Sequence, residues 1–83
     1  MNVTILYFAA VRDLVGKDEE RVALPEGIAT VGALAEHLPK LHPSLGGRLG
    51  SVRFARNEEF AHDVDPIAEG DVIALIPPVA GGC

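Results

Sequence analysis

Two apolar runs lie near the two ends of the chain. Residues 3–8 read VTILYF and residues 72–77 read VIALIP, so each run has the length of a strand and is rich in β-branched or aromatic side chains. A run with so few polar positions is typical of a strand in the middle of a sheet. We therefore expect these two strands to lie side by side at the centre of one sheet.

The segments between these runs alternate between apolar and polar positions and predict the outer strands. Residues 21–25 alternate, and a short connection would place them antiparallel to the first strand. Residues 51–55 alternate in the same way, and a turn at Asn57–Glu58 leads into a short strand around Phe60. The charged connection Lys17–Glu20 is interpreted as a solvated loop.

Helical spacing of apolar residues predicts one main helix and a shorter one. Thr30 is expected to cap the main helix, which should end before Pro39. The shorter helix has one or two turns and should stop at Gly16, while residues 39–50 indicate a turn or a short irregular helix. The apolar positions are Val11, Leu14 and Val15 in the short helix, Val31, Leu34, Ala35 and Leu38 in the main helix, and Leu41 and Leu45 beyond it.

These elements predict one small α+β domain with a β-grasp fold. A mixed sheet of four to five strands would hold the first and last strands at its centre, and the main helix would cross one face. At 83 residues the chain has room for one core. We expect the β-grasp domain to span residues 1–76 and a flexible, extended tail to span residues 77–83.

The charge of the chain limits its class of partner. Seven Lys and Arg against twelve Asp and Glu give a formal net charge of −5, whereas nucleic acids and anionic membranes attract basic proteins. A basic surface on a protein partner is favoured instead. The lone Cys83 cannot form an internal disulfide, and the first residues do not resemble a signal peptide, so we expect a cytoplasmic protein.

Catalytic and metal-binding constellations are not recognisable in the sequence. His37, His42 and His62 lack the spacing of a metal site and are interpreted as surface or edge residues. No serine lies in a G-x-S-x-G motif. Glu58 and Glu59 are neighbours in a predicted turn, so they point apart and are interpreted as solvated charges. We expect no bound metal or cofactor.

The segment after the last strand has a composition that favours an extended tether. Pro77 and Pro78 cannot donate to a sheet ladder and favour an extended chain. Residues 77–82 can reach on the order of 20 Å when extended. Gly81 and Gly82 have no side chains, so a slot just wide enough for a bare backbone would admit them. The segment is either inserted into the active site of a partner or a frayed terminus.

Three stretches of the sequence resemble the small subunit of molybdopterin synthase, a family of ubiquitin-like sulfur-carrier proteins. They read VTILYFAAVRDLVG near the start, NEEF in the middle and DPIAEGDVIALIPPVAGG near the end. The resemblance runs from Val3 to Gly82, and Gly-Asp-Val followed by Pro-Pro-Val-x-Gly-Gly is its most specific part. It favours the inserted tail over the frayed terminus.

The resemblance implies a sulfur carrier, not a self-sufficient enzyme. In that family a ubiquitin-activating-like adenylyltransferase uses ATP to adenylate the C-terminal glycine, which is then converted to a thiocarboxylate. The tail enters the large subunit of molybdopterin synthase and donates its sulfur to cyclic pyranopterin monophosphate, forming molybdopterin. By position, Gly82 would hold the sulfur and Gly81 would allow threading. Pro77, Pro78 and Val79 would set the exit direction and contact the channel of the partner.

An exposed face of the sheet is a second candidate surface for the partner. Phe8, Phe54 or Phe60 are the aromatic residues that this face would offer. The alternative for each is a place in the core.

The sequence departs from the family pattern at Cys83, which follows Gly82. The Gly82 carbonyl is therefore in a peptide bond and offers no carboxylate to adenylate. We expect a peptidase to remove Cys83 from a precursor. Two alternatives remain open: the Cys83 thiol attacks the Gly82 carbonyl to give a thioester, or Cys83 is incidental in a copy that has lost or changed its function.

Other functions of the same fold also remain open. The chain could be a sulfur carrier for thiamine or cysteine biosynthesis. It could also be a ubiquitin-like modifier joined to lysines through Gly82, or a plain interaction module without an activated tail.

Overall fold

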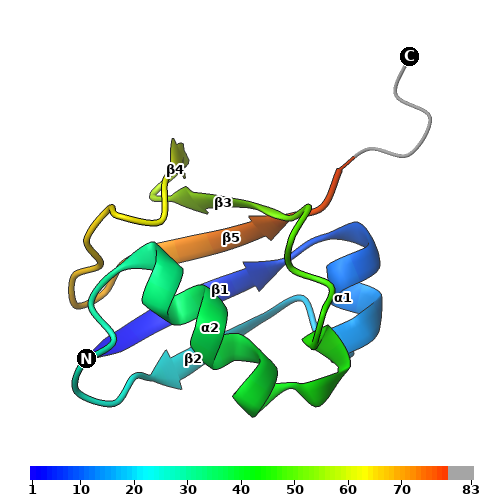
Figure 1. Cartoon of the computed structure of the whole chain (residues 1–83), viewed down its shortest axis with the longest axis horizontal. Coiled ribbons are helices and arrows are strands. Elements are labelled where there is room, and N and C mark those ends of the chain that lie inside the picture. The colour runs from blue at the N-terminus through cyan, green and yellow to red at the C-terminus, as the bar shows by residue number, and fades with distance from the viewer. Residues whose placement is uncertain (79–83) are drawn as a thin grey trace.

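The computed structural model describes residues 1–78 and has a β-grasp fold, as the sequence predicts (Figure 1). The strands are β1 (Asn2–Tyr7), β2 (Glu19–Ala23), β3 (Arg53–Arg56), β4 (Glu59–Ala61) and β5 (Val72–Ile76). The helices are α1 (Ala9–Val15), α2 (Val31–Leu41) and the single 3₁₀ turn η1 (Pro43–Leu45). The short helix, the main helix and the irregular turn that the sequence predicts all occur.

Strands β1 and β5 lie side by side and parallel at the centre of the sheet, whose order is β2-β1-β5-β3-β4. β3 is antiparallel to β5 on the other side, and β2 and β4 form the two edges. The prediction that the first and last strands are central neighbours is confirmed. Because β5 is hydrogen-bonded on both sides, the point at which it ends is fixed by the whole sheet.

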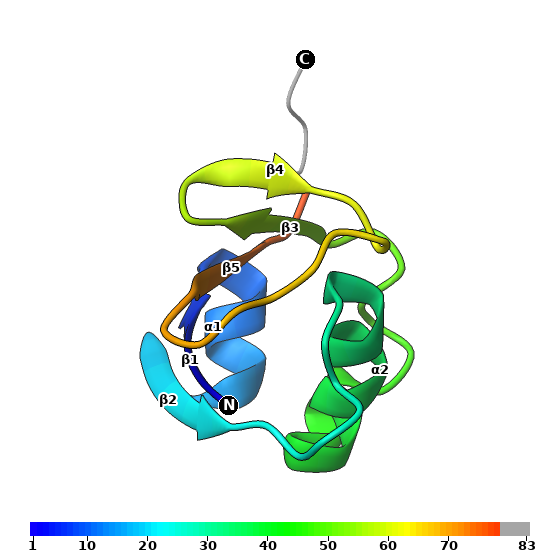
Figure 2. The same cartoon turned by 90° about the vertical axis from the view of Figure 1, so that its left-hand side faces the viewer.

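Both helices lie on the same side of the sheet and cover one face of it (Figure 2). Alternate residues of the central strands point toward the helices and are buried there, as the two-residue period of a strand requires. The core formed in this way includes Val3, Ile5 and Tyr7 of β1, Ile73 and Leu75 of β5, and Val11, Val31, Leu34, Leu38 and Leu45 of the helical layer.

Helix α2 begins as predicted but ends later. Thr30 caps it, because its Oγ1 accepts a hydrogen bond from the Ala33 N–H at 3.2 Å. The expected end before Pro39 is wrong, since the helix continues to Leu41. Proline in the last turn removes one intrahelical donor, but the buried Leu38 and the hydrogen bond from the His42 N–H to the Leu38 carbonyl at 2.8 Å hold the final turn in place.

The interpretation of Lys17–Glu20 as a solvated loop is wrong for Glu20. This residue lies in β2 opposite Ile5, and its Oε1 accepts a hydrogen bond from the Tyr7 hydroxyl at 2.6 Å. Partial burial opposes the charged form of Glu20, but the hydrogen bonds from Tyr7 and His42 outweigh burial and lower its pKa. The polar contact anchors the edge strand β2 to the buried ring of Tyr7.

His42, which the sequence indicates to be a surface or edge residue, lies at the sheet edge and is held there by contacts. Its Nε2 hydrogen-bonds Glu20 Oε1, and its ring meets that of Tyr7 edge to face at 5.9 Å between centroids. Only 19% of the His42 side chain is exposed. Because α2 extends one turn further than expected, it delivers His42 to the edge of β2.

The last strand ends at Ile76, and neither Pro77 nor Pro78 is part of the sheet. Most of the tail expected at residues 77–83 lies outside the described residues, so the division of the chain at residue 76 stays a prediction. None of the helices within residues 1–78 has the length and the apolar run that crossing a membrane needs.

Candidate functional site

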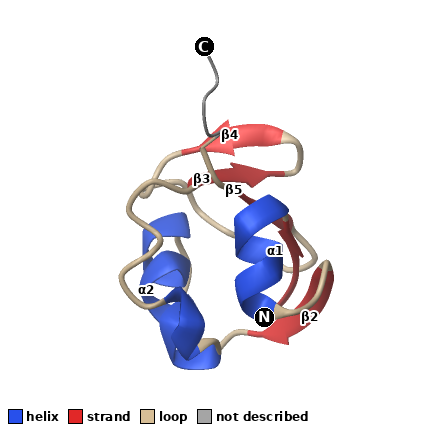
Figure 3. Cartoon of the chain, turned by 90° about the vertical axis from the view of Figure 1, so that its right-hand side faces the viewer, coloured by secondary structure: helices blue, strands red, loops and turns tan. Residues whose placement is uncertain are grey.

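Both helices lie on one side of the sheet (Figure 3), and the opposite face is lined in its middle mainly by apolar side chains. One row of side chains crosses four strands in register. Leu6 of β1 lies opposite Ala74 of β5, which lies opposite Ala55 of β3, which in turn lies opposite Phe60 of β4. Neighbouring residues of a strand point to opposite faces, and Ile5, Phe54 and Ile73 belong to the core, so this row points away from the helices.

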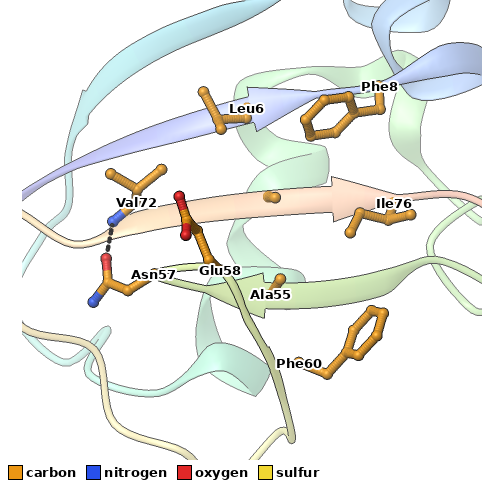
Figure 4. A pocket seen from close by; sticks show the side chains of 9 residues that line it. Leu6, Phe8, Ala55, Asn57, Glu58, Phe60, Val72 and Ile76 are labelled. Carbon is orange, nitrogen blue, oxygen red and sulfur yellow. Dashed lines mark hydrogen bonds between the residues drawn. The ribbon is translucent and has the colours of Figure 1, made fainter.

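This row forms the floor of an apolar groove of 560 Å³ (Figure 4). Phe8, which is 45% exposed, stands on the β1 side of the groove, and Phe60, which is 62% exposed, stands on the β4 side. Two exposed aromatic rings flanking small residues are unusual for a face without a partner. The groove is lined by Leu6, Phe8, Ala55, Asn57, Glu58, Phe60, Val72, Ala74 and Ile76.

The three phenylalanines considered as partner contacts therefore differ in where they lie. Phe8 and Phe60 line the groove, whereas Phe54 is 7% exposed and belongs to the core. The β3–β4 hairpin explains the difference, because Phe54 and Ala55 are adjacent in one strand and point to opposite faces.

One end of the groove is the tight turn between β3 and β4. Asn57 and Glu58 both have positive φ, 51° and 73°, which suits a two-residue hairpin turn. Asn57 also ties this turn to β5, since its N–H donates to the Val72 carbonyl at 2.8 Å and its Oδ1 accepts from the Val72 N–H at 3.0 Å. The second of these bonds is drawn in Figure 4.

Asp71 stabilises this turn through hydrogen bonds from its residues and its neighbours. Its side chain accepts hydrogen bonds from the Ala68 N–H at 2.8 Å, from Asn57 Nδ2 at 3.1 Å and from Arg56 Nη1 at 3.2 Å. The residue is 8% exposed. Burial opposes its charged form, but the donors from Ala68, Asn57 and Arg56 outweigh burial and lower the pKa of Asp71. A single charged residue thus fixes both the start of β5 and the β3–β4 turn.

The other end of the groove is the exit of the tail. Ile76 lines the groove and is the last residue of β5, so Pro77 and Pro78 leave the sheet at this end. Pro77 is half-buried and Pro78 is exposed. The remaining predicted site residues, which are Val79, Gly81, Gly82 and Cys83, lie outside the described residues.

The main surface feature of residues 1–78 is the apolar groove. No group of three metal-binding side chains gathers within residues 1–78. His37 and His62 lie on α2 and after β4, and His42 is engaged with Glu20. The arrangement therefore places an apolar groove next to Pro77 and Pro78, where the chain leaves the sheet.

A sequence profile described as the ThiS family matches residues 5–82, nearly the whole chain. The chain belongs to the ThiS family. One relative is the molybdopterin synthase sulfur carrier subunit of Chlamydomonas reinhardtii. It is 34% identical to this chain over 84 residues, and the match covers 99% of this chain and 100% of the relative. The resemblance that the sequence shows to molybdopterin synthase small subunits is thereby confirmed.

Two solved structures share the fold of this ThiS-family chain. The crystal structure of small archaeal modifier protein 1 from Haloferax volcanii has a TM-score of 0.82 and 31% identity, and covers 94% of this chain and 98% of its own. A chain in the complex of subunits 1 and 2 of molybdopterin-converting factor from Helicobacter pylori 26695 has a TM-score of 0.69 and 24% identity. The match covers 99% of this chain and 100% of that chain. At that identity the second likeness shows the fold alone.

The residues that hold one end of the groove in this ThiS-family chain are not evident from its sequence. Asp71 follows a glycine before the last strand and is typical of a turn residue, whereas in the structure it organises a network with Arg56 and Asn57. A signal was present, because an acidic residue directly before an apolar strand can bond the backbone of its own turn. The link to Arg56 and Asn57 spans 15 and 14 residues and could not be read from local sequence.

We predict that Asp71→Asn lowers the free energy of unfolding by about 1–3 kcal/mol at neutral pH, because a carboxylate with three donors is lost. Since the pKa of Asp71 is lowered in the folded protein, its contribution is complete above the unfolded pKa of about 4 and is lost as the pH falls through the lowered value. Urea unfolding of both proteins between about pH 3 and pH 7 measures this difference. Exposed Asp13→Asn is the control, and an Asp71→Asn deficit that does not shrink on acidification would contradict the assignment.

Proposed function

We propose that this chain is a cytoplasmic sulfur carrier and the small subunit of a molybdopterin synthase. The observation that carries the proposal is the place where the chain leaves the sheet, because the centrally bonded β5 delivers Pro77 and Pro78 beside an apolar groove on the face opposite the helices. The full-length likeness to the C. reinhardtii sulfur carrier subunit supports the same function.

The proposed chemistry takes place at the Gly82 carboxylate. An activating enzyme transfers the adenylyl group of ATP to this carboxylate and releases pyrophosphate, so that the acyl carbon becomes an electrophile. A sulfur donor then displaces AMP, and the acyl–oxygen bond is replaced by an acyl–sulfur bond. The resulting thiocarboxylate is a polarisable nucleophile on a tether that a partner can orient. No cofactor needs to be bound by the carrier itself.

The proposed partner is the large subunit of the synthase, which would accept the tail and bind cyclic pyranopterin monophosphate. The H. pylori structure is a complex of subunits 1 and 2 of molybdopterin-converting factor, and one chain of that complex has the fold of this chain. The groove between Phe8 and Phe60 supports docking of such a partner, because binding would remove these rings from water. The net charge of −5 favours a basic surface on it.

Removal of Cys83 is part of the proposal. Adenylation needs a free carboxylate, and in the sequence the Gly82 carbonyl is bonded to the nitrogen of Cys83. A peptidase that hydrolyses this bond would therefore precede activation. The carrier would then work as residues 1–82.

The decisive experiment reconstitutes sulfur transfer with chains ending at Gly82 and at Cys83. We predict that only the chain ending at Gly82 becomes a thiocarboxylate when it is incubated with the activating enzyme, ATP and a sulfur donor, and that it then forms molybdopterin with the large subunit. Intact mass and pterin fluorescence report the two steps. Failure of the Gly82 chain to accept sulfur would contradict the proposal, and equal charging of the full chain would contradict the need for trimming.

A second candidate function is a ubiquitin-like protein modifier joined to lysines through Gly82. It is favoured by the likeness to small archaeal modifier protein 1 of H. volcanii at 31% identity. The two functions share adenylation and differ in the acceptor. Lysine adducts ending in Gly-Gly in a digest of the source cells would support the modifier.

The docking face generates a separate prediction. Because Phe8 and Phe60 are exposed, the double variant Phe8→Ala/Phe60→Ala should change the free energy of unfolding by less than about 1 kcal/mol. The same variant should weaken binding to the large subunit by at least about tenfold, since aromatic anchors dominate interface energies. Calorimetric binding and urea unfolding measure the two effects. A variant that binds like the wild type would show that the partner docks elsewhere.

A further inference from the structure

Arg53 lies on the uncovered face at the end of the groove where the tail leaves. Its backbone is opposite Ile76 in the β3–β5 pair, and its guanidinium lies over the ring of Phe60 at 4.5 Å from the ring centroid. Arg53 is exposed, and so is Phe60. The Arg53 guanidinium is thus held in a defined place on the strand opposite Ile76, the residue that precedes Pro77. The chain as a whole has a net charge of −5.

A guanidinium held over an aromatic ring can still bind an anion, and Arg53 lies in such a position. A guanidinium that places its face on an aromatic ring keeps its N–H groups in the ring-parallel plane, where they can donate two hydrogen bonds to one carboxylate. Among residues 1–78 the ion pairs involve other cations, namely Arg12, Lys17, His42 and Arg56. The contact with the Phe60 ring also limits the side-chain entropy that Arg53 would lose on binding.

We propose that Arg53 is a specificity-determining residue that pairs with a carboxylate of the partner, beside the entrance through which the tail passes. This inference rests on the proposed function and specifies the chemistry of the partner. The matching surface is basic overall, presents an apolar side chain to the groove, and carries one Asp or Glu opposite Arg53. A nucleic acid is disfavoured as the anion because the chain as a whole is acidic.

The charge at the opposite end of the groove is negative, so a carboxylate of the partner would set the direction of docking. Glu58 lines the groove at the β3–β4 turn, whereas Arg53 lies at the tail exit. A partner docked in the reverse direction would bring its carboxylate against Glu58, and like charges at an interface are repelled. Correct docking therefore aligns the tail of the carrier with the channel of the partner.

The test compares two charge reversals with the same change in net charge. Arg53→Glu alters the docking face, and Lys40→Glu alters the exposed side of α2 in the helical layer. We expect Arg53→Glu to raise the Kd for the large subunit of its own synthase by about tenfold or more, and Lys40→Glu to change it by less than about twofold. Arg53→Lys should retain part of the affinity, because it keeps the charge but loses the planar fork.

Salt and stability measurements separate recognition from folding. Removing the charge with Arg53→Gln should flatten the dependence of log Kd on log salt concentration, since one attractive pair is lost. Urea unfolding of the Arg53 variants should match that of Lys40→Glu, because the residue is exposed. Equal binding by Arg53→Glu and Lys40→Glu would overturn the inference while leaving the sulfur-carrier function intact.

Two further outcomes would contradict the inference in distinguishable ways. If the wild-type chain does not bind the large subunit at all, the proposed function fails and the role of Arg53 fails with it. If sedimentation shows that the wild-type chain self-associates and Arg53→Glu does not, the carboxylate belongs to a second copy of this chain. We expect both proteins to sediment as monomers.

Discussion

The hydrogen bonding of β5 on both of its edges is the constraint on which the rest of the structure depends. β5 is parallel to β1 and antiparallel to β3, so its register is fixed by two neighbours. Its inward residues Ile73 and Leu75 are fully buried, while the outward Ala74 forms the floor of the groove. One strand therefore joins the core, the docking face and the start of the tail, and its two ends determine the two ends of the groove.

The two faces of the sheet have separate roles because strand residues alternate in direction. The helical side contains the core, and its edge is tied by the contact of Tyr7 with Glu20. Within residues 1–78 the other side carries no helix, and it offers small residues between two exposed aromatic rings. Asp71 connects the two faces. It accepts a hydrogen bond from Asn57 in the turn at one end of the groove and another from the Ala68 N–H just before β5. A carrier needs this rigidity, because a short tether positions its reactive end only as well as its base is positioned.

Local pattern was sufficient to predict the elements and the central pairing of the first and last strands, because apolar runs of strand length have few other uses in so small a domain. It was not sufficient for Pro39, where the burial of Leu38 outweighed the usual effect of proline, or for Glu20, whose partners come from β1 and from the end of α2. The groove could be anticipated only as a choice among Phe8, Phe54 and Phe60. The pairing of β3 with β4 decides that choice, and strand register is a property of the folded sheet.

The central claim is that Gly82 becomes the terminal, sulfur-bearing residue of the chain. Intact-mass measurement of the protein purified from its own cells tests this claim most directly. The account predicts a species that ends at Gly82, together with a fraction in which one oxygen is replaced by sulfur. Finding only chains that retain Cys83, in cells that are making molybdopterin, would contradict it.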